Sequence, residues 1–163
     1  MSIRDELLRA NREYAEGFDR GDLPMPPARR FVVVTCMDAR IDPTKILGLD
    51  LGDAHVLRNA GAIVNDDMLR SLVISRWMQD TEEVFVIGHT GCGMVGFTNE
   101  SLRERLAEET GVAASDIDFE AFPDIEESVR ASVAQIAESP YLQGVTASGW
   151  VYDVTSGELR EVV

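Results

Sequence analysis

Short apolar runs rich in β-branched residues recur along this chain, and longer segments with a single apolar side separate them. The short runs are typical of strands buried on both faces, and the longer segments of amphipathic helices. The predicted strands are 31–35, 54–60 and 83–89, followed by a strand, a turn and a final strand within 144–163. The predicted helices are 3–18, a short one starting at 43, 65–80, 98–110 and 123–139.

Capping signals place several of these helix ends. Asp42 precedes Pro43, which suits an N-cap and a first helical position, and Gly111 suits the stop of the fourth helix. In the helix 65–80 we expect one buried stripe, made of Leu69, Leu72, Val73 and Trp77.

The alternation of strands and helices predicts an α/β fold. Its central sheet would be mostly parallel, flanked by helices through right-handed crossovers, with an antiparallel edge strand at the C-terminus. The length of 163 residues suits a single domain over 1–163.

Composition excludes some partners. A formal net charge of −14 repels nucleic acid and anionic membranes. No apolar run approaches the ~20 residues of a membrane span, and the charged N-terminus lacks the apolar core of a signal peptide. We therefore expect a cytoplasmic protein, in which the two cysteines are free thiols or metal ligands rather than a disulfide.

Those cysteines lie at predicted strand ends. Cys36 follows the strand 31–35. His89 is the last residue of the strand 83–89, and Cys92 follows that strand. Carboxyl ends of neighbouring parallel strands share one edge of a sheet, so these side chains should meet. Two thiolates and an imidazole suit Zn²⁺, and three protein ligands leave its fourth position open, as in catalytic sites.

Asp38 and Arg40 adjoin this set. Asp38 could orient a zinc-bound hydroxide, and Arg40 would keep Asp38 ionised and turned away from the metal. If Asp38 instead became a fourth ligand, as at low pH, the site would be closed. A closed site would serve structure or regulation, and a structural ion pair is the duller alternative for Asp38 and Arg40.

The motifs CMDAR (36–40) and HTGCG (89–93), with RNAGAIVNDDMLRSL between them, resemble those of the β-class carbonic anhydrases. The resemblance implies zinc-dependent, reversible hydration of CO₂ to bicarbonate and a proton through zinc-bound hydroxide. It further implies Cys36, His89 and Cys92 as zinc ligands, Asp38 and Arg40 as the catalytic pair, and the Gly93 N–H as a substrate contact. It also implies a homodimer or higher homo-oligomer, with an N-terminal helical arm (1–22) packed on the partner.

One departure bears on the branch of the family. Plant-type members carry a glutamine before the first motif, where this chain has Pro26-Pro27-Ala28, so the chain resembles the small, archaeal-like branch. Some relatives hydrolyse carbon disulfide or carbonyl sulfide, and this alternative stays open. Arg58 is expected to join two loops, and His55 to be an ordinary histidine.

Overall fold

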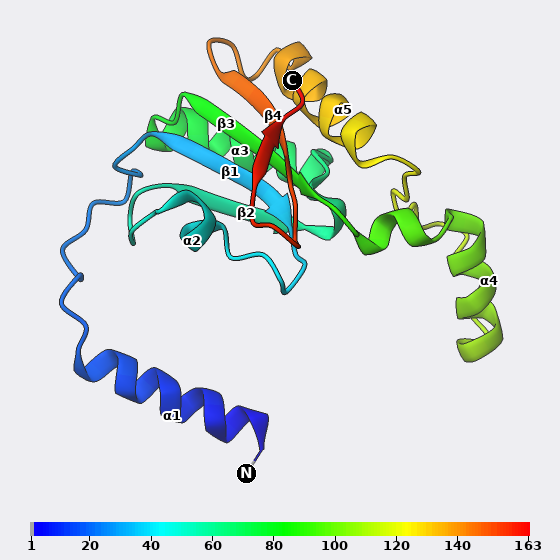
Figure 1. The fold of residues 1–163 in the computed structure, drawn as a ribbon, viewed down its shortest axis with the longest axis horizontal. Coiled ribbons are helices and arrows are strands. Elements are labelled where there is room, and N and C mark those ends of the chain that lie inside the picture. Colours follow the sequence, from blue (N-terminus) through cyan, green and yellow to red (C-terminus); the bar gives the residue numbers. More distant parts are fainter. Residues whose placement is uncertain (1) are drawn as a thin grey trace.

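One five-stranded sheet forms the centre of the molecule (Figure 1). The computed structural model describes residues 2–163. The strand order is β2-β1-β3-β4-β5, with parallel pairing except between β4 and β5. The strands are β1 (Phe31–Cys36), β2 (His55–Asn59), β3 (Glu83–His89), β4 (Thr146–Tyr152) and β5 (Leu159–Glu161). The predicted fold class, including the antiparallel edge strand, is confirmed.

The helices begin and end close to the predicted positions. They are α1 (Ile3–Glu16), α2 (Pro43–Leu47), α3 (Asp66–Gln79), α4 (Asn99–Thr110) and α5 (Ile125–Glu138), with 3₁₀ turns η1 (Ala60–Ala62) and η2 (Gly93–Gly96). The side chain of Asp42 accepts hydrogen bonds from the first backbone N–H groups of α2, and Asn65 caps α3 in the same way. Gly111 ends α4 with φ of 75°, a conformation that glycine adopts without strain.

The two faces of the sheet are covered unequally. Helices α3 and α5 pack on one face over a core of valines from β1, β3 and β4. The other face meets mainly α2 and the segments around it, and there Phe85 and Trp150 are only partly buried. All six residues of β1 are buried, as expected for a central strand between two layers.

Trp77 corrects one prediction. It is 60% exposed and not part of the core, and its indole Nε1 donates to the carbonyl oxygen of Tyr141 at 2.7 Å. The buried residues of α3 are Met68, Leu72 and Ser75, which follow one another at intervals of four and three. Because Trp77 comes five residues after Leu72, it points well away from that stripe.

Helix α1 lies apart from the rest of the molecule in Figure 1, at the end of the segment 17–30. No residue of α1 is buried, although Ile3, Leu7 and Tyr14 follow one another at helical spacing, and Phe18, just beyond the helix, is exposed too. Among the described residues, no helix combines the length and apolar character needed to cross a membrane.

Candidate metal centre

Three metal-binding side chains meet at the carboxyl ends of β1 and β3. These strands are parallel neighbours, so Cys36 at the end of β1 lies near His89 at the end of β3. Cys92 follows in the tight turn after β3, where Gly91 has φ of 63°. From β1 the chain connects to β2 on one side of this pair of strands, and from β3 it connects to β4 on the other side. The three side chains therefore lie at a topological switch point of the sheet.

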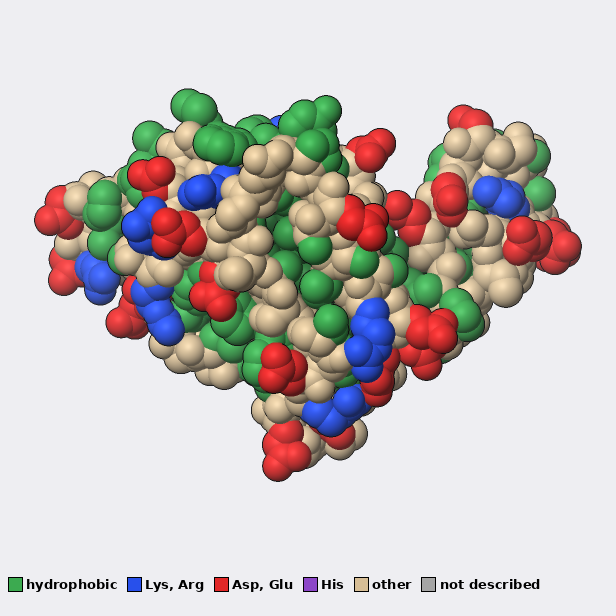
Figure 2. Space-filling model, turned by 90° about the horizontal axis from the view of Figure 1, so that it is seen from above, with side chains coloured by type: hydrophobic (Ala, Val, Ile, Leu, Met, Phe, Trp, Pro, Cys, Tyr) green, Lys and Arg blue, Asp and Glu red, His purple; other side chains and the backbone are tan. Residues whose placement is uncertain are grey.

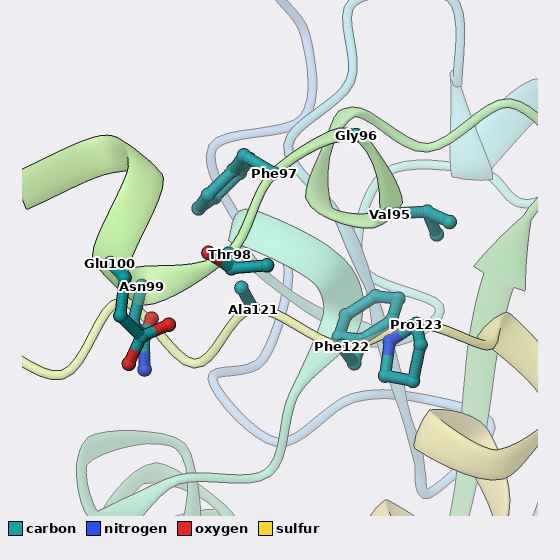
Figure 3. Close-up of a pocket in the computed structure, with 9 residues that line it drawn as sticks. All are labelled: Val95, Gly96, Phe97, Thr98, Asn99, Glu100, Ala121, Phe122 and Pro123. Atoms are coloured by element: carbon teal, nitrogen blue, oxygen red, sulfur yellow. The ribbon is translucent and has the colours of Figure 1, made fainter. Parts of the chain in front are cut away.

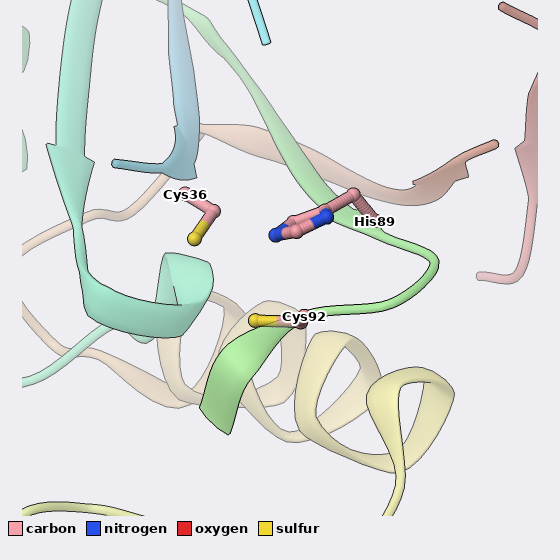
Figure 4. Close-up of side chains that lie close together, drawn as sticks. All are labelled: Cys36, His89 and Cys92. Carbon is pink, nitrogen blue, oxygen red and sulfur yellow. The ribbon is translucent and has the colours of Figure 1, made fainter. Parts of the chain in front are cut away.

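The three donor atoms face one another. The sulfurs of Cys36 and Cys92 and an imidazole nitrogen of His89 all lie within 4.8 Å of each other. Figure 4 shows both sulfur atoms and the His89 ring directed into one shared space. All three residues are buried, and the cysteines are not joined in a disulfide.

Hydrogen bonds fix the orientation of these donors. The Nδ1 of His89 lies 3.0 Å from the carbonyl oxygen of Thr90, so Nδ1 donates and the lone pair is left on Nε2. The buried Nε2 has no hydrogen-bond partner among the described residues and faces the two sulfurs. The backbone N–H of Gly61 donates to the sulfur of Cys36 at 3.4 Å. A buried nitrogen without a partner beside two thiols is what a metal ion would satisfy.

The two thiols differ in acidity. Burial opposes ionisation of Cys36, but the adjacent imidazole of His89 and the backbone N–H groups of Gly61 and Asp38 outweigh it and lower the pKa of Cys36 to about 7. Burial raises the pKa of Cys92 to about 11, and the negative charges of Cys36 and Asp38 add to this effect. Two adjacent thiolates are therefore favourable only with a positive ion between them. The donor set fits zinc, which binds thiolate and imidazole together.

Asp38 and Arg40 form a rigid pair beside these donors. Arg40 donates from Nε to Oδ1 of Asp38 at 2.9 Å and from a terminal nitrogen to Oδ2 at 2.7 Å. The same guanidinium donates to the carbonyl oxygen of Gly91 at 2.9 Å, which ties the two motifs together. These hydrogen bonds from Arg40 hold the pKa of Asp38 far below its usual range. Oδ2 of Asp38 lies 3.8 Å from Nε2 of His89.

A cavity of about 300 Å³ opens onto this centre. Cys36, Asp38 and Cys92 form its polar side, and Gly93 also lies on its wall. The remaining lining residues are small or apolar: Met37, Ala60, Gly61, Met94 and Phe97. Such a space admits a small uncharged molecule next to the donors.

A larger cavity of about 480 Å³ shares Phe97 with the first (Figure 3). It contains none of the three donors, and its walls are mostly apolar side chains and glycine, with Glu100 as its one titratable residue. Its chemistry offers no reactive group, so the smaller cavity is the candidate site.

Sequence reasoning missed two residues of this region. Gly61 has φ of 87°, and a Cβ at this position would lie 2.7 Å from the Phe122 ring. The N–H of Gly61 donates to the sulfur of Cys36, and glycine adopts this left-handed conformation without strain. The signal for Gly61 was its place in RNAGA at the end of a strand, whereas Phe122 comes from a loop without any motif.

Comparison with known proteins identifies the family. The family model described as carbonic anhydrase matches residues 31–159. The chain belongs to the carbonic anhydrase family. It is 42% identical to β-carbonic anhydrase 1 of Mycobacterium tuberculosis over 163 residues, which cover 99% of both chains.

Two further proteins are similar to this chain. The crystal structure of a carbonic anhydrase from Streptococcus mutans superposes with a TM-score of 0.95 at 46% identity, over 100% of this chain and 99% of that one. A carbon disulfide hydrolase of Acidithiobacillus thiooxidans is 29% identical over 98% of this chain and 90% of its own length. The structure brings Cys36, His89 and Cys92 together and places Asp38, Arg40 and Gly93 beside them, and the roles of these residues stay predictions.

Proposed function

We propose that this protein is a zinc-dependent enzyme that interconverts CO₂ and bicarbonate. The observation that carries the proposal is the convergence of three buried donors, Cys36, His89 and Cys92, beside an ionised carboxylate and a small, largely apolar cavity. Zinc held by these donors supplies the Lewis acidity that makes water a nucleophile near neutral pH.

The residues of the chain then have separate tasks. Asp38, held ionised by Arg40, accepts a hydrogen bond from the attacking water and orients its lone pair towards the substrate. Arg40 uses two donors on this carboxylate, which keeps Asp38 from turning to the metal. The Gly93 N–H is assigned to a substrate oxygen, and the apolar walls of the cavity hold CO₂ without competing hydrogen bonds.

The direct test combines metal analysis with a rate measurement. The purified protein should contain about one zinc per chain, by the three-ligand logic of catalytic zinc sites. Stopped-flow measurement should show CO₂ hydration that disappears on chelation and returns when zinc is added back. Protein with a full complement of zinc and no hydration activity from neutral to alkaline pH would contradict the proposal.

The alternatives are less well supported. The carbon disulfide hydrolase named above is 29% identical to this chain, against 42% for the β-carbonic anhydrase. Sulfide release from carbon disulfide, measured beside CO₂ hydration, separates the two activities. A non-catalytic site closed by Asp38 conflicts with the two hydrogen bonds that hold this carboxylate on Arg40.

We also propose a cytoplasmic homodimer, in which the arm 1–22 packs on the partner. Isolated amphipathic helices are marginal in water, and α1 leaves Ile3, Leu7 and Tyr14 exposed, with Phe18 exposed just beyond it. A reducing compartment suits two free cysteines that hold a metal. Light scattering on the full chain should give a dimer or a larger assembly. The double variant Leu7→Asp/Tyr14→Asp should shift it to smaller species, whereas Arg9→Ser on α1 should not.

A further inference from the structure

The guanidinium of Arg58 contacts the segment that carries a metal-binding cysteine and the catalytic carboxylate. Its Nε donates to the carbonyl oxygen of Cys36 at 2.9 Å, and one terminal nitrogen donates to the carbonyl oxygen of Asp38 at 2.8 Å. One side chain therefore holds two backbone positions that lie two residues apart in the first motif.

This contact occurs where the sheet ends. Residue 58 lies opposite Thr35 in the β1–β2 pairing, and the last bond of the ladder runs from the Met37 N–H to the carbonyl oxygen of Asn59 at 2.9 Å. Beyond this point no strand pairing supports the segment 37–41, which turns back through a bond from the Ile41 N–H to the carbonyl oxygen of Asp38. The side chain of Arg58 therefore holds the segment after β1 by hydrogen bonds, where the pairing of β1 with β2 has ended.

The charge of Arg58 is not used in an ion pair. Among the described residues, no carboxylate lies within 4.0 Å of its guanidinium, in a chain with 29 acidic residues and 15 basic ones. Most other arginines of this protein form an ion pair with a carboxylate, whereas the guanidinium of Arg58 donates to backbone carbonyl oxygens. Its planar fork matches two acceptors at fixed positions, which a single ammonium group does not reproduce.

We propose that Arg58 is a positioning residue of the metal centre: by fixing the carbonyl oxygens of Cys36 and Asp38, it sets the sulfur and the carboxylate in their working places. This inference rests on the proposed zinc site. Arg58 acts through these two residues and not on the substrate. Groups that orient the ligands of a metal contribute about 10–100-fold to its affinity, and a similar effect is expected for Arg58.

The test compares Arg58→Met, Arg58→Lys and Arg30→Met with the unmodified protein. Arg30 is a matched control, because its Nε also donates to a carbonyl oxygen, that of Asp80, and its terminal nitrogen pairs with Glu82, but at the opposite end of β1. Zinc affinity is measured by competition with a chromophoric chelator. The absorption spectrum of the cobalt-substituted protein reports the geometry of the ligands. Neither readout depends on CO₂ hydration.

We expect Arg58→Met to weaken zinc binding about 10–100-fold and to change the cobalt spectrum, with Arg58→Lys between it and the unmodified protein. Arg30→Met should lower the melting temperature while leaving zinc affinity and spectrum unchanged. Unchanged affinity and spectrum in Arg58→Met would overturn the proposal. If Arg58→Met does not fold, the test rests on Arg58→Lys. Zinc affinity and a cobalt spectrum equal to those of the unmodified protein in Arg58→Lys would then overturn the proposal. Loss of zinc affinity without any CO₂ hydration in the parent protein would reject the proposed function and keep the role of Arg58.

Discussion

Asp38 is the residue on which the proposed chemistry depends most, because it is the one carboxylate that lines the cavity at the donors. Asp38→Asn removes its charge while keeping its size. We expect the variant to retain zinc and to lose about 10²–10⁴-fold in kcat/KM for CO₂, the usual contribution of a positioned proton acceptor. Zinc content by plasma spectrometry and stopped-flow hydration check this.

Asp42→Asn is the matched control for this substitution. Asp42 caps α2 through Thr44 and Lys45 and does not line the cavity. Asparagine is as good an N-cap as aspartate, so this substitution should leave both the rate and the stability nearly unchanged. An Asp38→Asn variant that works at the rate of the parent protein would remove Asp38 from the mechanism.

The thiol pKa values predict how zinc binding depends on pH. Zinc takes thiolates, so every proton still on a cysteine must leave when the metal binds. With the pKa of Cys36 at about 7, this thiol is ionised at pH 9 and protonated at pH 6, whereas Cys92, at about 11, is protonated at both. The affinity for zinc should therefore fall as the pH falls, and more protons should be released at pH 6 than at pH 9.

Calorimetry in buffers of different ionisation enthalpy counts those protons. The count should rise between pH 9 and pH 6 as Cys36, and His89, whose pKa the neighbouring Cys36 raises, take up protons. A proton count that stays constant over this range would mean that Cys36 does not change its protonation between pH 9 and pH 6, and that His89 and the Gly61 N–H do not hold its pKa near 7.

The sequence could predict the donors but not everything that surrounds them. Cys36, His89 and Cys92 are recognisable because each ends or closely follows an apolar run, and parallel strands bring such ends to one edge. The contact between Gly61 and Phe122 joins segments 61 positions apart through packing alone. No local pattern in the sequence encodes such a contact.

At the scale of the elements, the packing of α5 on the sheet depends on two glycines, Gly88 of β3 and Gly149 of β4. A Cβ at Gly149 of β4 would lie 2.6 Å from a methyl carbon of Val129 in α5 and 2.7 Å from one of Val163. Gly149→Ala should therefore lower the free energy of unfolding by about 1–3 kcal/mol, the usual cost of overpacking. Chemical denaturation of the metal-loaded protein measures this.

Gly17→Ala provides the control for this change. Gly17 follows α1 with φ of −104°, and a Cβ there meets nothing within 4 Å. Its replacement should change stability by less than about 0.5 kcal/mol, as for an ordinary surface site. If Gly149→Ala lowered the free energy of unfolding no more than Gly17→Ala does, α5 would be able to move away from β4 at no cost in free energy.

Elements were more predictable from the sequence than the faces they present. The five α-helices and five strands of residues 2–163 follow from period and capping residues, because those signals are local. The burial of Trp77 was predicted wrongly, because a large aromatic residue close to a helical stripe reads as core. The side of α3 that packs on the sheet carries Met68, Leu72 and Ser75, and Trp77 lies outside it.

At the scale of the whole molecule, the negative charge is spread out. Figure 2 shows acidic side chains over much of the visible surface, with basic ones between them, while the upper edge of the main body is largely hydrophobic. Most of the ion pairs join exposed side chains, and each such pair contributes about 0–1 kcal/mol. A formal net charge of −14 remains, so the folded state carries repulsion that its ion pairs do not remove.

Salt should therefore stabilise this protein. Raising the ionic strength from a low value to about 0.15 M shortens the Debye length to about 8 Å, which screens repulsion between distant charges more than attraction within close pairs. We expect the melting temperature of the metal-loaded protein to rise, by about 2–4 °C for each kcal/mol of repulsion removed. Scanning calorimetry measures this, and NaCl and KCl should give the same curve if screening is the cause. A melting temperature that stays constant or falls with salt would show that the local ion pairs outweigh the net charge.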